Sequence, residues 1–173
     1  MIHDITSQFT SACAEGNQAR LQTLLDHPEA TLNANIFVGT VFELHWTIKE
    51  YIRQDMHLTL IPGACEQGLT GGQKTIEAIE MVMRQKQHLF DAETAGKALA
   101  YACCICRPLV PIILELFSDR LLQDSIIRAN HICAHYCPSI CQLIMTACAA
   151  QMSKGRYNSL YGQKQPVTTA ITV

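Results

Sequence analysis

The sequence has little net charge, because 13 Lys and Arg residues nearly balance 15 Asp and Glu residues and leave a formal charge of −2 over 173 residues. Proteins that bind duplex nucleic acid or an anionic membrane surface carry a clear excess of basic side chains on one face. The composition therefore argues against nucleic acid and membrane as partners.

The first residues lack the basic, apolar and small-residue zones of a secretion signal, since the acid Asp4 is followed closely by polar Thr6 and Ser7. The nine cysteines are an odd number, and most lie between Cys103 and Cys148, some as direct neighbours. Small disulfide scaffolds do not show this pattern. We expect a reducing compartment and a cytoplasmic location.

Asp, Glu, Lys and Arg are all missing between Arg128 and Lys154, which is long enough for a membrane-spanning helix. Polar residues and a proline interrupt this stretch too often for a bilayer helix: Asn130, His131, His135, Pro138, Ser139 and Gln142. The pattern favours a buried helix pair over membrane insertion.

Apolar residues make up 49% of the chain, which is enough for the core of one folded domain. They recur at helical spacing, as in Leu21, Leu24 and Leu25, then Ile76, Ile79, Val82 and Met83. Gly and Pro residues fall between these stripes, so the sequence predicts an all-α fold of short, paired helices. Branched residues cluster only at Ile36–Val41 and His57–Ile61, where any minor sheet would lie.

The composition changes near the end of the sequence. From Ser153 onward the residues are mostly polar, with glycines, a proline and no acid. We expect residues 1–152 to form a helical-repeat domain and residues 153–173 to form a polar tail that is mobile or loosely docked.

A short pattern of small residues followed by a turn residue occurs four times. It reads Ala12-Cys13-Ala14-Glu15-Gly16, Ala64-Cys65-Glu66-Gln67-Gly68, Ala102-Cys103-Cys104-Ile105-Cys106 and Cys133-Ala134-His135-Tyr136-Cys137. Small side chains let a helix approach its neighbours closely, and the turn residue then reverses the chain into a bulkier second helix. The sequence thus predicts stacked antiparallel helix pairs.

These repeats resemble the ankyrin-repeat family, over roughly Ser7 to Met152. The best local match combines Ala12-Cys13, Gly16-Asn17, Leu21, Leu24, Leu25 and Leu32-Asn33. A third unit with Leu99, Ala102, Cys103, Val110, Ile113 and Leu114 looks similar, and His131 falls at the family's first-helix histidine. The sequence departs from the family in lacking a Thr-Pro-Leu-His tetrapeptide, in placing Cys106 and Cys137 at turn glycines, and in a long insertion, Asn35 to Leu60, between the first two units.

The resemblance implies that the chain binds another protein through the concave face of the first helices, as an adaptor, an inhibitor or a bacterial effector in a host cytosol. Carried onto this sequence, the partner-binding residues are Glu15, Glu66, Gln67, Tyr101, His135 and Tyr136. The aromatic ones would provide large contact areas at low entropic cost. The alternative is that each aromatic ring only covers its own helix.

No cofactor, metal or catalytic residue is expected, but the cysteines and histidines raise the questions of a metal site and of an enzyme. On a helix His131 and His135 share one side and Cys133 and Cys137 the opposite side, so one metal ion cannot bind all four. A Cys/His-dependent hydrolase or transferase remains an alternative, but nothing selects a nucleophile and base. The second alternative is a homo-oligomeric helical protein, whose copies would be joined through the charge-free residues 130–151.

Overall fold

The computed structural model describes residues 5–28, 30–43, 71–136 and 138–153, and every regular element within these ranges is a helix. The helices are α1 (Thr6–Ala14), α2 (Gln18–Asp26), α3 (Ala34–Glu43), α5 (Gly71–Gln85), α6 (Ala92–Ile105), α7 (Leu109–Phe117), α8 (Gln123–Tyr136) and α9 (Pro138–Ala147), with a short 3-10 helix, η2 (Gln87–Leu89). The predicted all-α class is confirmed for this part of the chain.

Helix α3 corrects the prediction of a β-like run at Ile36–Val41. Phe37, Val38 and Val41 are buried while Ile36 is exposed, and this spacing places the apolar side chains on one side of a helix. Burial of a helical stripe thus outweighs the strand preference of branched residues. The second β-like run, His57–Ile61, lies outside the described residues.

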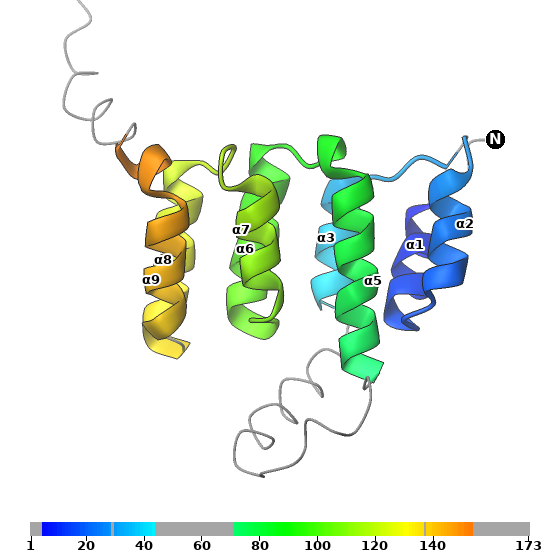
Figure 1. Ribbon diagram of the computed structural model, residues 1–173, viewed down its shortest axis with the longest axis horizontal. Helices are drawn as coiled ribbons and strands as arrows, with labels where there is room; N and C mark the ends of the chain where they lie inside the picture. The colour runs from blue at the N-terminus through cyan, green and yellow to red at the C-terminus, as the bar shows by residue number, and fades with distance from the viewer. Residues whose placement is uncertain (1–4, 29, 44–70, 137, 154–173) are drawn as a thin grey trace, which may run out of the picture.

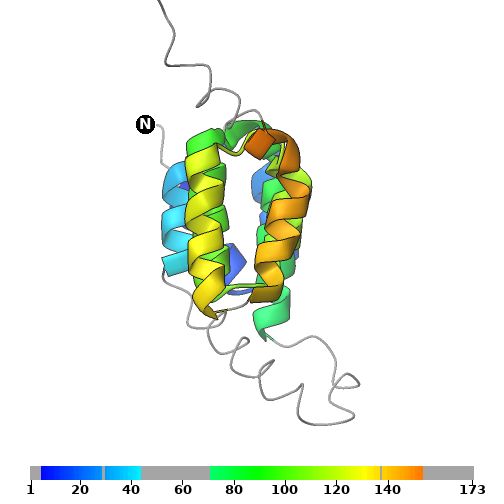
Figure 2. The ribbon, with the colours of Figure 1, turned by 90° about the vertical axis from the view of Figure 1, so that its left-hand side faces the viewer.

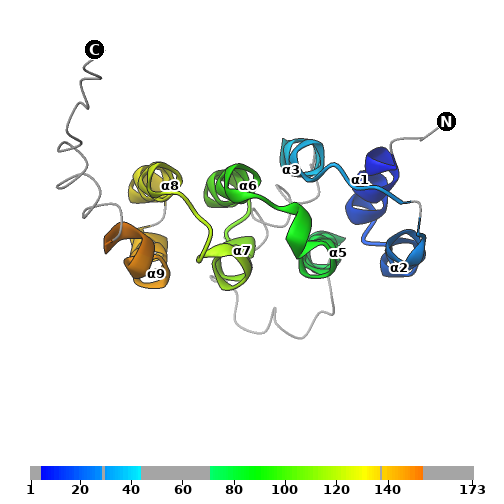
Figure 3. The same cartoon turned by 90° about the horizontal axis from the view of Figure 1, so that it is seen from above.

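The described helices lie in two layers along one axis (Figures 1 and 3). The first layer contains α1, α3, α6 and α8, and the second contains α2, α5, α7 and α9. Backbone contacts join neighbours within each layer and join α1 to α2, α6 to α7 and α8 to α9 across the layers. We call α1/α2, α3/α5, α6/α7 and α8/α9 the first to fourth pairs.

The second pair differs from the prediction. The expected first helix around Ala64-Cys65 lies outside the described residues, and α3 instead stands between α1 and α6 in the first layer. The insertion therefore does not begin at Asn35, because residues 34–43 are part of the array. The sequence pattern failed here because α3 carries large apolar residues, Phe37 and Val38, where the other first helices carry small ones.

The turns inside the pairs follow their residue types. Gly16 has a φ of 61°, the left-handed conformation that glycine adopts at low cost, and Asn17 then caps α2 by accepting a hydrogen bond of 3.0 Å from the Arg20 amide. Cys106 ends α6 with a φ of −148°. The third pair thus turns without a left-handed residue, as expected for cysteine.

Small residues on the first helices are buried between neighbouring pairs. Ala12 and Cys13 on α1, and Ala102 and Cys103 on α6, are at most 1% exposed. Cys133 on α8 is also buried, but Ala134 is exposed. The small residues of the pattern are thus buried in the first and third pairs, and one of the two is buried in the fourth.

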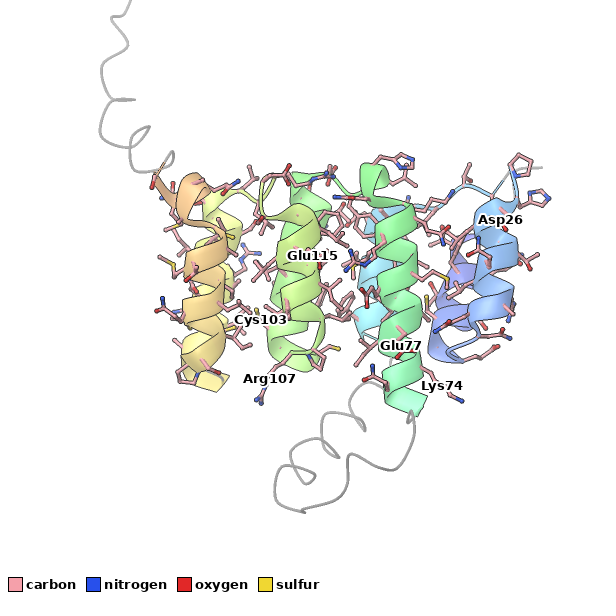
Figure 4. The ribbon with its side chains drawn as sticks, viewed as in Figure 1. Asp26, Lys74, Glu77, Cys103, Arg107 and Glu115 are labelled. Atoms are coloured by element: carbon pink, nitrogen blue, oxygen red, sulfur yellow. The ribbon has the colours of Figure 1, made fainter. Side chains whose placement is uncertain are left out.

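Polar bridges join the second-layer helices. Arg84 of α5 donates two hydrogen bonds of 2.9 Å to the carboxylate of Glu115 on α7, which Figure 4 labels. These contacts lower the pKa of Glu115 below its usual value. On the other side of α5, Gln85 Nε2 donates to Gln22 Oε1 of α2 at 3.1 Å. Side chains of α5 thus link it to both of its neighbours in the second layer.

Candidate interaction surface

Of the six predicted binding residues, the structure describes the side chains of two, Glu15 and Tyr101. Glu15 is exposed at the turn after α1 and forms an ion pair of 3.4 Å with Arg20. Tyr101 lies on α6, two pairs further along the array. Glu66 and Gln67 lie outside the described residues, as do the side chains of His135 and Tyr136, whose backbone belongs to α8.

Tyr101 joins two first-layer helices. Its ring stacks on Phe42 of α3, with the ring centroids 6.1 Å apart and the planes inclined by 19°. Phe42 is fully buried, while Tyr101 is half-buried. The ring therefore does more than cover its own helix, because one side seals the contact between α3 and α6.

One surface runs along the first layer, on the side that faces away from the second layer. We call it the first-helix face and define it by exposed or half-buried residues that lie opposite the buried side of each helix: Ser11 on α1, Ile36 and Thr40 on α3, Lys97 and Tyr101 on α6, and Arg128 on α8. All four pairs contribute to it, because α1, α3, α6 and α8 stand side by side in one row (Figure 3).

Side-chain hydrogen bonds fix neighbouring helices along the first-helix face. The Thr10 and Thr40 hydroxyls lie 3.2 Å apart and link α1 to α3. Lys97 Nζ donates to Asn35 Oδ1 at 2.9 Å and links α6 to α3. A surface held in this way loses little conformational entropy when it binds a partner.

Sequence reasoning missed Ile36, the most exposed apolar residue on this face. Its side chain is 46% exposed, and it stands in α3 between Asn35 and Thr40, the two residues that link α3 to its neighbours. The signal was present, since Ile36 falls outside the helical stripe formed by Phe37, Val38 and Val41. The branched residues from Ile36 to Val41 instead suggested a place for a minor sheet, so no helix face was assigned to this segment.

Most cysteines in the described part of the chain are buried. Burial raises the pKa of Cys13, Cys103 and Cys148, and raises that of Cys106 to about 12. Such thiols hold few thiolates at neutral pH, and the thiolate is the nucleophilic form. Cys104, by contrast, is exposed on α6.

Metal and membrane sites can be assessed for the described part of the chain. There, no group of three or more His, Cys, Asp or Glu side chains is arranged to hold a metal ion. His131 is exposed while Cys133 is buried, so the two side chains point to different sides of α8, as their spacing predicts. None of the described helices has the length and hydropathy needed to cross a bilayer.

Comparisons of this chain with protein-family models, with curated proteins and with solved structures found no match in any of the three.

Proposed function

We propose that this protein is an interaction module resembling a divergent ankyrin-repeat array, and that it binds another protein through the first-helix face. The observation that supports this most directly is the row of four first helices, which exposes Ile36 among side chains fixed by hydrogen bonds. Repeat arrays use such extended surfaces to bind other proteins.

The chemistry of the first-helix face favours a partner with an apolar contact region and a polar rim. Ile36 and the exposed part of the Tyr101 ring offer apolar and aromatic contact area, and Thr40 and Lys97 on the same face are polar. Protein interfaces commonly combine buried apolar anchors with a surrounding polar rim.

Catalysis is not part of this proposal. The buried cysteines with raised pKa, Cys13, Cys103 and Cys106, are poor candidates for a nucleophile. These three buried cysteines therefore do not support the alternative of a Cys/His-dependent hydrolase or transferase.

The test is affinity capture from cell lysate with the wild type and two variants, Ile36→Lys and Ile127→Lys. The two isoleucines are matched, because both lie on first-layer helices and are 46% and 50% exposed, but only Ile36 lies on the first-helix face. Circular dichroism and thermal unfolding verify that both variants fold.

We expect one protein to be retained by the wild type and by Ile127→Lys and lost from Ile36→Lys. With that protein purified, Ile36→Lys should weaken binding by at least about tenfold, as for a central interface residue. Equal retention by all three forms would contradict the assignment of the face. If none retains a protein, the interaction module itself is wrong.

A further inference from the structure

The first helices of the third and fourth pairs, α6 and α8, approach each other closely. Both begin at the same edge of the array (Figure 1), and a Cβ atom added to Gly96 of α6 would lie 2.9 Å from Ser125 Cβ of α8. Cys103 lies seven residues after Gly96, and Cys133 lies eight residues after Ser125. Each helix makes about two turns over that distance, so the sides that meet at Gly96 and Ser125 meet again at the two cysteines.

The thiols of Cys103 and Cys133 are in contact in the structure. A hydrogen bond joins the two side chains, and both residues are buried. Figure 4 labels Cys103 where the third pair meets the fourth. A third thiol, that of Cys141 on α9, donates instead to the backbone carbonyl of Asn130 at 3.4 Å. Cys103 and Cys133 therefore form a pair of side chains that links α6 to α8.

We propose that Cys103 and Cys133 are a redox-sensitive pair, and that their oxidation to a disulfide locks the third helix pair to the fourth. The oxidant is hydrogen peroxide. It converts one thiol to a sulfenic acid and releases one water molecule. The second thiol then attacks that sulfur, forms the S–S bond and releases another water molecule. The peroxide thus accepts the two electrons that the two thiols lose.

The surroundings of the pair fit a disulfide better than a bound metal ion. Residues 129–153, which contain Cys133 and all of α9, include no Asp, Glu, Lys or Arg. A monovalent soft metal ion held by two thiolates would leave a net negative charge buried there, which is costly without a partner. A disulfide is neutral and carries no such cost.

Oxidation requires the fourth pair to open, because the closed array covers both thiols. This pair stands at one end of the described array, nearest to the viewer in Figure 2, and packs against the third pair. An end unit of a repeat array has a neighbour on one side only, so it opens at a lower cost than an inner unit. We therefore expect the pair to stay reduced in a reducing compartment and to oxidise slowly when peroxide accumulates.

The disulfide would stabilise the array and fix part of the first-helix face. It would close a loop of roughly 30 residues, which restricts the unfolded chain. Tyr101 and Arg128 of the first-helix face lie on the two helices that it joins. The link would therefore hold the two helices that carry these side chains together when the fourth pair would otherwise open.

The test is exposure of the full chain to hydrogen peroxide, followed by blocking of the remaining thiols and mass spectrometry without reduction. A Cys104→Ser background removes the exposed thiol of α6, which could join two molecules. We expect the main disulfide to join Cys103 to Cys133 and to be reversed by dithiothreitol. The oxidised protein should have a Tm higher by roughly 5–10 °C.

Cysteine variants separate this pair from the other thiols. Cys103→Ala and Cys133→Ala should each abolish the disulfide and the rise in Tm. Cys13→Ala is the matched control, because Cys13 is equally buried but lies on α1, and it should change neither. Circular dichroism verifies that the variants fold, and the disulfide map of the background protein does not depend on Cys103→Ala or Cys133→Ala.

Two results would overturn the proposal. One is that Cys103 and Cys133 both stay reduced after exposure to peroxide that fully oxidises Cys104 in the wild type. The other is that either cysteine pairs mainly with a different one, such as Cys141. Neither result bears on partner capture through Ile36, so the redox pair and the first-helix face are tested separately.

Discussion

Gly16 and Lys74 meet where the first turn of the array touches α5. A Cβ atom added to Gly16 would lie 2.5 Å from Lys74 Cβ, which is closer than such atoms approach in proteins. Gly16 also has a φ of 61°, and its position next to α5 is strengthened by the Thr75 hydroxyl, which donates to the Ala14 carbonyl at 3.1 Å. The turn of the first pair is thus fitted to the next second-layer helix, near the labelled Lys74 (Figure 4).

Replacing Gly16 should destabilise the protein for both reasons. We expect Gly16→Ala to lower the free energy of unfolding by about 2 kcal/mol, through backbone strain and the contact with Lys74. Urea denaturation measures the change. Gly39→Ala is the control, because a Cβ there meets nothing within 4 Å and the helix should gain about 0.5–1 kcal/mol. If Gly16→Ala and Gly39→Ala changed the free energy of unfolding equally, the described conformation of the turn at Gly16 would be contradicted.

Gly96 allows α6 to approach α8. A Cβ on Gly96 would lie 2.9 Å from Ser125 Cβ and would also overlap the Ser125 hydroxyl. We expect Gly96→Ala to lower the free energy of unfolding by about 1 kcal/mol, despite the higher helix propensity of alanine. In a double-mutant cycle with Ser125→Gly the two changes should be coupled, and additive effects would argue against the close approach.

Asp91 caps α6 by accepting a hydrogen bond of 2.8 Å from the Thr94 amide, and this bond lowers the pKa of the Asp91 carboxyl. We expect Asp91→Ala to lower the free energy of unfolding at pH 7 by about 1 kcal/mol. Because the folded-state pKa is the lower one, the contribution of ionisation is complete above the unfolded pKa of about 3.9 and is lost as the pH falls through the folded value.

Thermal unfolding between pH 2 and pH 7, a range that brackets the usual carboxyl pKa of about 3.9, measures this dependence. The difference between the wild type and Asp91→Ala should shrink at acidic pH. Asp91→Asn keeps an acceptor for the Thr94 amide and should cost less than the alanine at neutral pH. A wild-type advantage that persists unchanged at the acid end would show that the charge of Asp91 makes no contribution.

Cys104 should be the most reactive thiol among the described cysteines of α6 and its turn. It is exposed, whereas burial raises the pKa of Cys103 and Cys106. Alkylation of the native protein, followed by fragment mass spectrometry, should label Cys104 at least about tenfold faster than these neighbours. Cys104→Ser should remove that fast labelling, and full unfolding should abolish the difference.

The helical class and most pair boundaries could be predicted from the sequence because each depends on local residues. Gly16 marks a left-handed turn, and the buried stripe of Ile76, Ile79 and Val82 follows from helical spacing. The second pair could not be predicted in this way. The pattern near Ala64 looked like a first helix, but α3 takes that place in the array because its apolar side chains fit between α1 and α6.

The candidate surface was harder to predict, because its contacts depend on which helices become neighbours in the array. Tyr101 could be identified as a surface aromatic on a first helix, but its stacking on Phe42 depends on which helix lies next to α6. The same holds for the link between Lys97 and Asn35, residues that are far apart in sequence. Contacts between pairs follow from the stacking, which local spacing does not reveal.

The separation of α3 from α5 in the chain also bears on how the protein folds. The helices of the first and third pairs are joined by short turns, residues 15–17 and 106–108, whereas residues 44–70 lie between α3 and α5. The third and fourth pairs, whose contacts are local in sequence, should therefore nucleate folding, and the second pair should close late and join the two ends of the array.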